Sequence, residues 1–308
     1  MNPAFSVIIF TTLAGAAQGM VLCLALAVLL GVLPQDAAML APSLAVALGM
    51  LAAGLVASLF HLGHPERAWR AVLMWRTSWL SREVIVLPAF MGVVGMWWLL
   101  NRQGAGGNLL PFLAIVLAFA LWLCTGMIYV CIRFIQEWAH PITVLNFVLM
   151  GVSSGLILTC LMAQASGQAD FASRLLPWAL ALTVAAWGSR MLSLQRNAGL
   201  KPVSTLQSAT GIRAQKLQQK SMGMSAGAFN TREFFHQATQ AAFKQVKLSF
   251  IVLAFAVPTA CLVGALASGG LQLVWFAMLA QCAGLLAERW FFFAQARHPQ
   301  NLYYQVVS

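Results

Sequence analysis

The densest group of polar and titratable side chains lies between two long apolar runs, in residues 61–83. His61 directly follows one apolar run, and Glu83 opens the next. A histidine exchanges protons near neutral pH, and a carboxyl group held near membrane depth is a functional candidate. Such a pair can hydrogen-bond the two oxygens of a quinone headgroup and carry its protons. An alternative stays equally open: His61 caps a helix end, and Glu83 pairs with Arg82 or Arg67 as a structural anchor.

A second acid–base pair stands near the end of the last apolar run. Glu288 and Arg289 precede the aromatic residues 290–293. Such a pair is typical of an interface anchor, but it can also line the same pocket as residues 61–83 if the helices pack together. His64, Glu288 and Arg289 are therefore the further candidates for that pocket.

Other redox groups are not expected in this chain. The six cysteines lie in or beside apolar runs and form no C-x-x-C pair, whereas iron–sulfur clusters need grouped cysteine ligands. The five histidines all lie at or beyond the ends of the apolar runs, which disfavours a haem between facing helices. We therefore expect no haem, no iron–sulfur cluster and no metal site.

The elements that must position these side chains are membrane helices. Hydrophobic residues make up 61% of the 308 residues and charged residues 8%, which excludes a soluble domain and a disordered chain. Runs of about 20 apolar residues predict transmembrane helices. The sequence thus predicts an all-α integral membrane protein, a bundle of eight helices in one membrane domain. The predicted spans are residues 4–33, 42–60, 84–100, 109–131, 142–163, 174–194, 248–268 and 271–293.

The basic residues predict the orientation of this bundle. With eight spans, all but Arg102 and Arg174 of the 18 Lys and Arg residues fall on the face that also holds both termini. The positive-inside rule places that face in the cytoplasm. We therefore interpret the net charge of +11 as a topology signal in a bacterial inner membrane rather than as a nucleic-acid surface.

Residues 195–247 form the longest polar connection and are the candidate docking region. They are rich in Gln, Ser, Lys and Arg, and we expect an amphipathic helix over about 231–247 that lies at the membrane interface. A surface for a cytoplasmic partner is the further hypothesis for this region. Its candidate residues, with two from the 61–83 segment, are Arg70, Arg76, Arg232, Phe235 and His236.

The 61–83 segment resembles the DmsC family. The residues that carry the resemblance are His61-Leu62-Gly63-x-Pro65 with Arg67-Ala68, then Ser81-x-Glu83, and the aromatic run after Arg289. Members of this family are eight-helix membrane anchors of molybdoenzymes similar to dimethyl sulfoxide reductase. The resemblance implies that the chain does none of the molybdenum chemistry itself, but carries the site where a quinone reacts.

The resemblance also implies cofactors and partners. His61 and Glu83 match the family's quinone-site histidine and glutamate, and Arg67, Ser81 and Arg82 join that site by proximity. The quinone is ubiquinone or menaquinone. A ferredoxin-like iron–sulfur subunit and a molybdopterin catalytic subunit are the expected partners on the cytoplasmic face.

Further segments favour one branch of the family. Residues 204–209, 229–236 and 301–304 are similar to those of the anchor of a cytoplasm-facing, sulfite-oxidising molybdoenzyme, which passes electrons to quinone. One alternative is a quinol-oxidising anchor of a dimethyl sulfoxide or other S- or N-oxide reductase. Two others are a purely structural tether and a non-redox transporter. In a transporter we would expect ionisable residues at mid-membrane depth, whereas the charges here cluster at one face.

Overall fold

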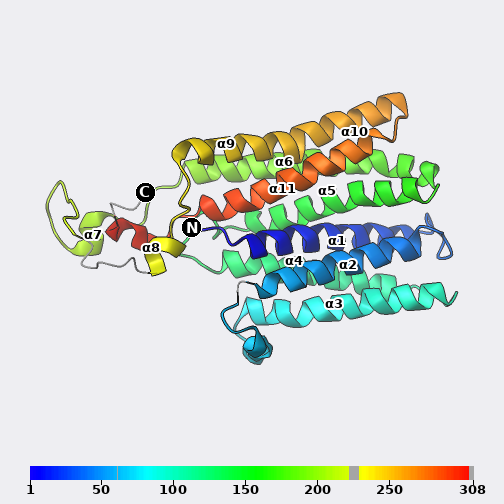
Figure 1. Ribbon diagram of the computed structural model, residues 1–308, viewed down its shortest axis with the longest axis horizontal. Coiled ribbons are helices and arrows are strands. Elements are labelled where there is room, and N and C mark those ends of the chain that lie inside the picture. Colours follow the sequence, from blue (N-terminus) through cyan, green and yellow to red (C-terminus); the bar gives the residue numbers. More distant parts are fainter. Residues whose placement is uncertain (61, 222–228, 305–308) are drawn as a thin grey trace.

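The described part of the chain is a long bundle of helices without strands. The computed structural model describes residues 1–60, 62–221 and 229–304. Most of the helices run side by side along the long axis (Figure 1). The elements are α1 (Phe5–Leu29), α2 (Leu40–Leu59), the 3-10 helix η1 (Pro65–Met74), α3 (Trp79–Arg102), α4 (Leu109–Val130), α5 (Ile142–Ala165), α6 (Ala169–Ala198), α7 (Leu206–Thr210), α8 (Phe229–Glu233), α9 (Gln240–Ile251), the π-helical turn η2 (Val252–Ala256), α10 (Val257–Ser268), α11 (Leu273–Ala294) and the 3-10 helix η3 (Pro299–Tyr303).

Seven helical stretches in the described residues are long and apolar enough to cross a membrane. They are α1 to α6 and the continuous stretch α9–η2–α10, Gln240–Ser268. The eighth predicted span coincides with α11, which is not among the seven and carries Glu288 and Arg289 in its last turns. It nevertheless lies within the bundle, in contact with α1, α5, α9 and α10 (Figure 1).

Helix α1 forms the centre of the bundle. In its most apolar window 78% of the residues are buried, against 28% in α3 at the edge. It contacts α2, α4, α5 and α11. The buried residues of α1 include many small ones, such as Ala14, Ala17 and Gly19, which allow neighbouring membrane helices to pack closely around it.

Small residues allow α1 and α5 to approach until their backbones touch. A Cβ added to Gly155 would lie 2.1 Å from the carbonyl carbon of Gly19, and one added to Gly19 would lie 2.0 Å from the carbonyl oxygen of Gly151. Glycine at such a crossing replaces side-chain contacts by backbone contacts, as is common between membrane helices.

We predict that Gly155→Ala separates α1 from α5 and destabilises the protein. Over-packing typically costs about 1–3 kcal/mol, and here the obstacle is backbone that cannot rotate away. Thermal unfolding of the detergent-solubilised protein measures the effect. Gly92→Ala in α3 is the matched control, since an added Cβ there meets nothing within 4 Å. Equal melting temperatures for the two variants would contradict the packing argument.

The helix expected over 231–247 is two helices. Helix α8 ends at Glu233 and α9 begins at Gln240. Between them Gln237 adopts a left-handed conformation with φ 55°. The Thr239 hydroxyl then accepts a hydrogen bond from the Ala242 backbone N–H at 3.1 Å and starts α9. A turn conformation and a strong N-cap interrupt a stripe of apolar residues that by itself favours one helix.

The irregular segments gather at one end of the bundle. Helices α7 and α8 and η3, together called the extension here, lie beyond the ends of the long helices, close to the N-terminus (Figure 1). The Asn301 side chain donates to the Phe234 carbonyl at 2.9 Å, and the Tyr303 hydroxyl donates to the Ala209 carbonyl at 2.9 Å. The η1 arm projects from the same end, beside α3 (Figure 1). The N-terminus, the η1 arm and the extension thus lie at one end of the bundle.

Candidate functional site

An apolar cavity of about 410 Å³ opens at the end of the bundle that carries η1. It is called the Glu83 cavity below, after the one charged side chain among the described residues that line it. Helices α1, α2, α3 and α4 form its walls, and residues of the connection between α2 and α3 cover it. The lining residues are Val7, Phe10, Thr11, Leu55, Ser58, Leu59, Leu62, Ala68, Trp69, Ala71, Leu80, Glu83, Val84, Leu87, Pro88, Thr125, Ile128 and Tyr129.

The start of α3 determines where Glu83 points. The Ser78 hydroxyl accepts a hydrogen bond from the Ser81 backbone N–H at 3.4 Å, so the helix begins at Trp79. Glu83 follows one turn later on the face turned to α4, and only 6% of its surface is exposed. The Thr125 hydroxyl donates a hydrogen bond to its Oε1. A carboxyl group is therefore held in a mainly apolar cavity, with a hydrogen bond from Thr125 of α4.

His61 lies outside the described residues. Leu59 and Leu62, which stand on either side of it in the sequence, both line the Glu83 cavity. The partnership of His61 with Glu83 therefore stays a prediction.

The other candidates from the 61–83 segment do not line the cavity. Arg67 and His64 are exposed and both approach Glu66, with distances of 3.6 and 3.0 Å to its Oε1.

Arg82 donates to the carbonyls of Trp75 and Arg76 at 3.0 and 2.9 Å, and its Cζ lies 4.2 Å from the centroid of the Trp79 ring. Ser81 is buried in the first turn of α3. In the structure Arg82 and Ser81 thus fix the start of α3, which in turn positions Glu83.

Glu288 and Arg289 belong to a separate group, which also includes Arg190 of α6. The Arg190 Nε lies 2.7 Å from Glu288 Oε1, and Arg289 Nη1 lies 3.5 Å from Glu288 Oε2. All three side chains are buried, with 1%, 0% and 4% exposure for Arg190, Glu288 and Arg289. This group, called the buried charge cluster below, does not line the Glu83 cavity.

Sequence reasoning assigned Arg190 to the charged cytoplasmic face and missed its burial. The sequence held a signal for this burial, because the small residues Thr183, Ala186 and Ser193 recur at helical spacing from Arg190. In the structure these three residues and Arg190 share the buried face of α6. Aromatic side chains separate the cluster from the Glu83 cavity. Arg289 Cζ lies 3.9 Å from the centroid of the Phe147 ring, on which Tyr129 stacks at 5.7 Å.

The candidate docking residues lie at the same end of the molecule. Phe235 and His236 line a hollow of about 420 Å³ between the bundle and the extension, and Arg232 is exposed beside it. Burial lowers the pKa of His236 from its usual value, which favours a neutral ring. Arg70 and Arg76 are exposed on the η1 arm, 5.7 and 5.4 Å from the centroids of the adjacent Trp69 and Trp75 rings.

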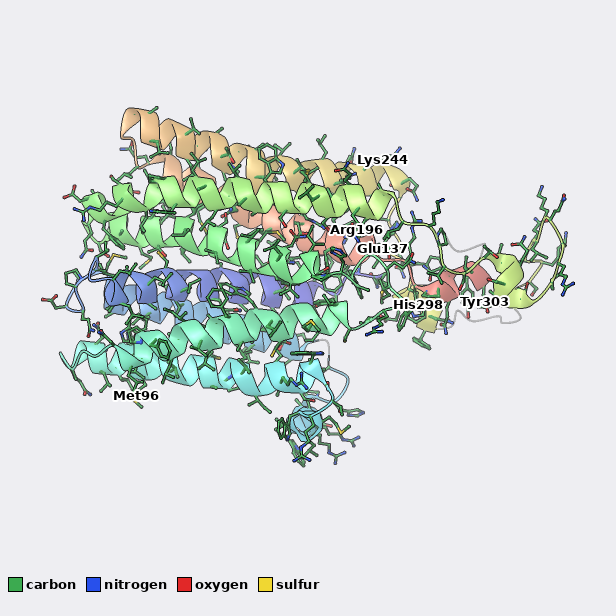
Figure 2. The ribbon with its side chains drawn as sticks, turned by 180° about the vertical axis from the view of Figure 1, so that it is seen from behind. Met96, Glu137, Arg196, Lys244, His298 and Tyr303 are labelled. Carbon is green, nitrogen blue, oxygen red and sulfur yellow. The ribbon has the colours of Figure 1, made fainter. Side chains whose placement is uncertain are left out.

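Hydrogen bonds connect the extension to the ends of the helices. Figure 2 shows Glu137, Arg196 and His298 near this junction, with Tyr303 farther out on the extension and Met96 at the opposite end of the bundle. The Asn2 backbone N–H donates to the Glu233 carbonyl of α8 at 2.8 Å, and the Arg297 backbone N–H, just before η3, donates to Glu137 Oε2 at 3.4 Å. These bonds hold the extension against the end of the bundle.

Comparison with known proteins identifies relatives over the whole chain. The model of a family described as DMSO reductase anchor subunit (DmsC) matches residues 1–294. A sulfite dehydrogenase subunit of Allochromatium vinosum is 45% identical over 326 residues, 100% of each protein. An anaerobic dimethyl sulfoxide reductase chain of Escherichia coli is 28% identical over 211 residues, 66% of this protein and 72% of the relative. The similarity to the first relative is thus both higher and more extensive.

Proposed function

This chain belongs to the DmsC family of dimethyl sulfoxide reductase anchor subunits, and from that membership we propose that it anchors a molybdopterin and iron–sulfur oxidoreductase complex and carries its quinone site in the Glu83 cavity. The observation that carries this proposal is a buried carboxyl group in a mainly apolar cavity at the end of the bundle. A quinone ring with its isoprenoid tail needs apolar walls and a few polar groups that orient it.

Glu83 has the proton role in this proposal. Reduction of a quinone to a quinol consumes two electrons and two protons. The electrons come from the iron–sulfur subunit expected at the same end of the bundle. A protonated Glu83 donates a hydrogen bond to one quinone oxygen and then transfers the proton, and Thr125 orients the carboxyl group. The predicted partner for the second oxygen is His61.

Sulfite is the proposed source of the electrons. The greater similarity to the sulfite dehydrogenase subunit than to the dimethyl sulfoxide reductase chain supports this choice. In that direction sulfite is oxidised to sulfate on the molybdopterin subunit, and the anchor reduces quinone. A dimethyl sulfoxide reductase anchor, which uses the same site to oxidise quinol, is the second candidate, favoured by the family description.

We further propose that α11 is an eighth membrane span and that the η1 end faces the cytoplasm of a bacterium. The buried charge cluster is compatible with a membrane span, because the Glu288 carboxylate lies beside both arginines and offsets part of their positive charge. The gathering of the basic connections, η1 and the extension at one end supports the orientation. Both termini and the docked partners then lie on the cytoplasmic side.

Photolabelling of the complex tests the quinone site. A short-chain azidoquinone, irradiated with the membrane-embedded complex, is expected to modify peptides of the Glu83 cavity that contain Leu62, Trp69 or Ile128. Excess unlabelled quinone should suppress the labelling. Competed labelling that maps instead to the hollow at Phe235 and His236, or to another subunit, would overturn the assignment.

A further inference from the structure

Tyr129 stands on the wall of the Glu83 cavity beside the carboxyl group. It lies in the last turn of α4, four residues after Thr125, so both side chains face the cavity from one side of the helix. Its side chain is buried, with 8% exposure. Glu83 on α3 and Tyr129 on α4 line the same cavity. A proton-bearing hydroxyl therefore accompanies the carboxyl group in the cavity.

Four aromatic side chains fix the orientation of the Tyr129 ring. Its centroid lies 5.1 to 5.7 Å from those of Trp138, Phe147, Phe292 and Phe293, with the Phe147 ring stacked and the others edge-on. None of these four rings lines the Glu83 cavity. Trp138 is itself held by a 3.0 Å hydrogen bond from Nε1 to the Phe292 carbonyl. Such packing pre-orients a ligand-binding group, so little rotamer entropy is lost when a ligand binds.

The remaining hydroxyl groups of the cavity are already occupied. Thr11 donates to the Val7 carbonyl at 2.8 Å, Ser58 donates to the Leu55 carbonyl at 2.7 Å, and Thr125 donates to Glu83. Among the described residues, by contrast, no group accepts a hydrogen bond from Tyr129. The Trp69 indole, also unbonded within the described part of the protein, belongs to a side chain that is 64% exposed. Among the described residues that line the cavity, Tyr129 is thus the buried neutral donor that remains for a ligand.

We propose that the Tyr129 hydroxyl is a quinone ligand that donates a hydrogen bond to a carbonyl oxygen of the headgroup in the Glu83 cavity. This inference rests on the proposed quinone site and adds a positioning group to it. A phenol hydroxyl suits a neutral ketone oxygen, because it donates without placing a full charge in an apolar cavity. Tyr129 binds the ring in a fixed orientation, and Glu83 transfers the proton.

The variant Tyr129→Phe, in the complex with its partner subunits, tests the proposal. It removes the hydroxyl and keeps the ring among its four neighbours. Loss of one hydrogen bond should raise the KM for a short-chain ubiquinone roughly tenfold, with a smaller change in kcat. Ser268→Ala, which removes a hydroxyl at the end of α10 on the opposite side of the bundle from the cavity (Figure 1), is the control and should leave both constants unchanged. A KM for Tyr129→Phe within twofold of the unsubstituted complex would overturn the proposal.

Infrared spectra of carbonyl-¹³C ubiquinone give a readout that a merely structural role would not change. In the unsubstituted complex a carbonyl band should lie below that of the free quinone, and Tyr129→Phe should return it toward the free value. A shifted band that Tyr129→Phe leaves in place would refute the role of Tyr129 while the quinone site stands. A spectrum identical to that of free quinone in both proteins would refute the quinone site itself.

A second measurement covers the case in which Tyr129→Phe fails to assemble. Fluorotyrosine can replace all three tyrosines of the protein, of which Tyr303 and Tyr304 lie outside the cavity. The more acidic phenol is a stronger donor, so the carbonyl band should move further from the free value. An unchanged band would overturn the proposal.

Discussion

Replacement of Glu83 by Gln in the assembled complex is expected to lower quinone-dependent turnover by about 10²- to 10⁴-fold, the usual contribution of a positioned acid or base. Glutamine keeps the size of the side chain and can still accept the hydrogen bond from Thr125. It cannot release a proton to the quinone. The loss should therefore appear mainly in kcat, and the KM for quinone should change less, because the cavity walls are unaltered.

The measurement is sulfite-driven reduction of a short-chain quinone by the membrane-embedded complex. Reduction of a water-soluble dye that takes electrons before the membrane subunit should remain at the level of the unsubstituted complex. Glu66→Gln is the matched control, because Glu66 is exposed on the η1 arm and lies outside the cavity. Full quinone turnover in Glu83→Gln with normal assembly would favour the purely structural tether. Loss of both activities would indicate failed assembly instead.

The position of Glu83 in the sequence was enough to make it a candidate site residue. It is an acidic residue that opens a long apolar run, and such a residue must either pair or do chemistry. Arg67 and Arg82 were grouped with it only by nearness in the sequence. Their side chains turn to Glu66 and to the carbonyls before α3, since short-range partners were available outside the cavity. Proximity in sequence therefore predicted a segment that contributes to the cavity wall, but not which of its side chains line the cavity.

Tyr129 could not be identified in this way. A single tyrosine in a continuous apolar run has the pattern of a packing residue, and most of its ring is indeed surrounded by other aromatic side chains. Its proposed role depends on the orientation of its ring, which is determined by contacts with α5 and α11, far from it in the sequence. The burial of Arg190 depends in the same way on Glu288 of α11. Helix positions follow from local hydropathy, whereas these contacts depend on how the helices are arranged.

The largest effect on stability is expected from Glu288→Leu. The substitution leaves the guanidinium groups of Arg190 and Arg289 buried beside each other without the carboxylate that both contact. Removal of one partner of a buried ion pair typically costs about 3–5 kcal/mol, because the charge left behind is neither solvated nor paired. We expect little folded protein in the membrane and a much lower melting temperature for what is recovered. Asp170→Leu, at the start of α6 and at the other end of the bundle, should have a small effect.

The triple variant Arg190→Met, Glu288→Leu, Arg289→Met tests whether the buried charge cluster stabilises the protein only through the attraction between its charges. If Glu288 serves only to offset positive charge of the two arginines, removal of all three charges should restore much of the stability lost in Glu288→Leu, since apolar residues of similar volume replace buried ion pairs at little cost. A more apolar α11 would then remain stable as a membrane span. Equal instability of the single and triple variants would contradict this account and show that the cluster makes contacts beyond its own charges. Restored stability with lost quinone turnover would instead assign the cluster a role in the reaction, although aromatic rings separate it from the Glu83 cavity.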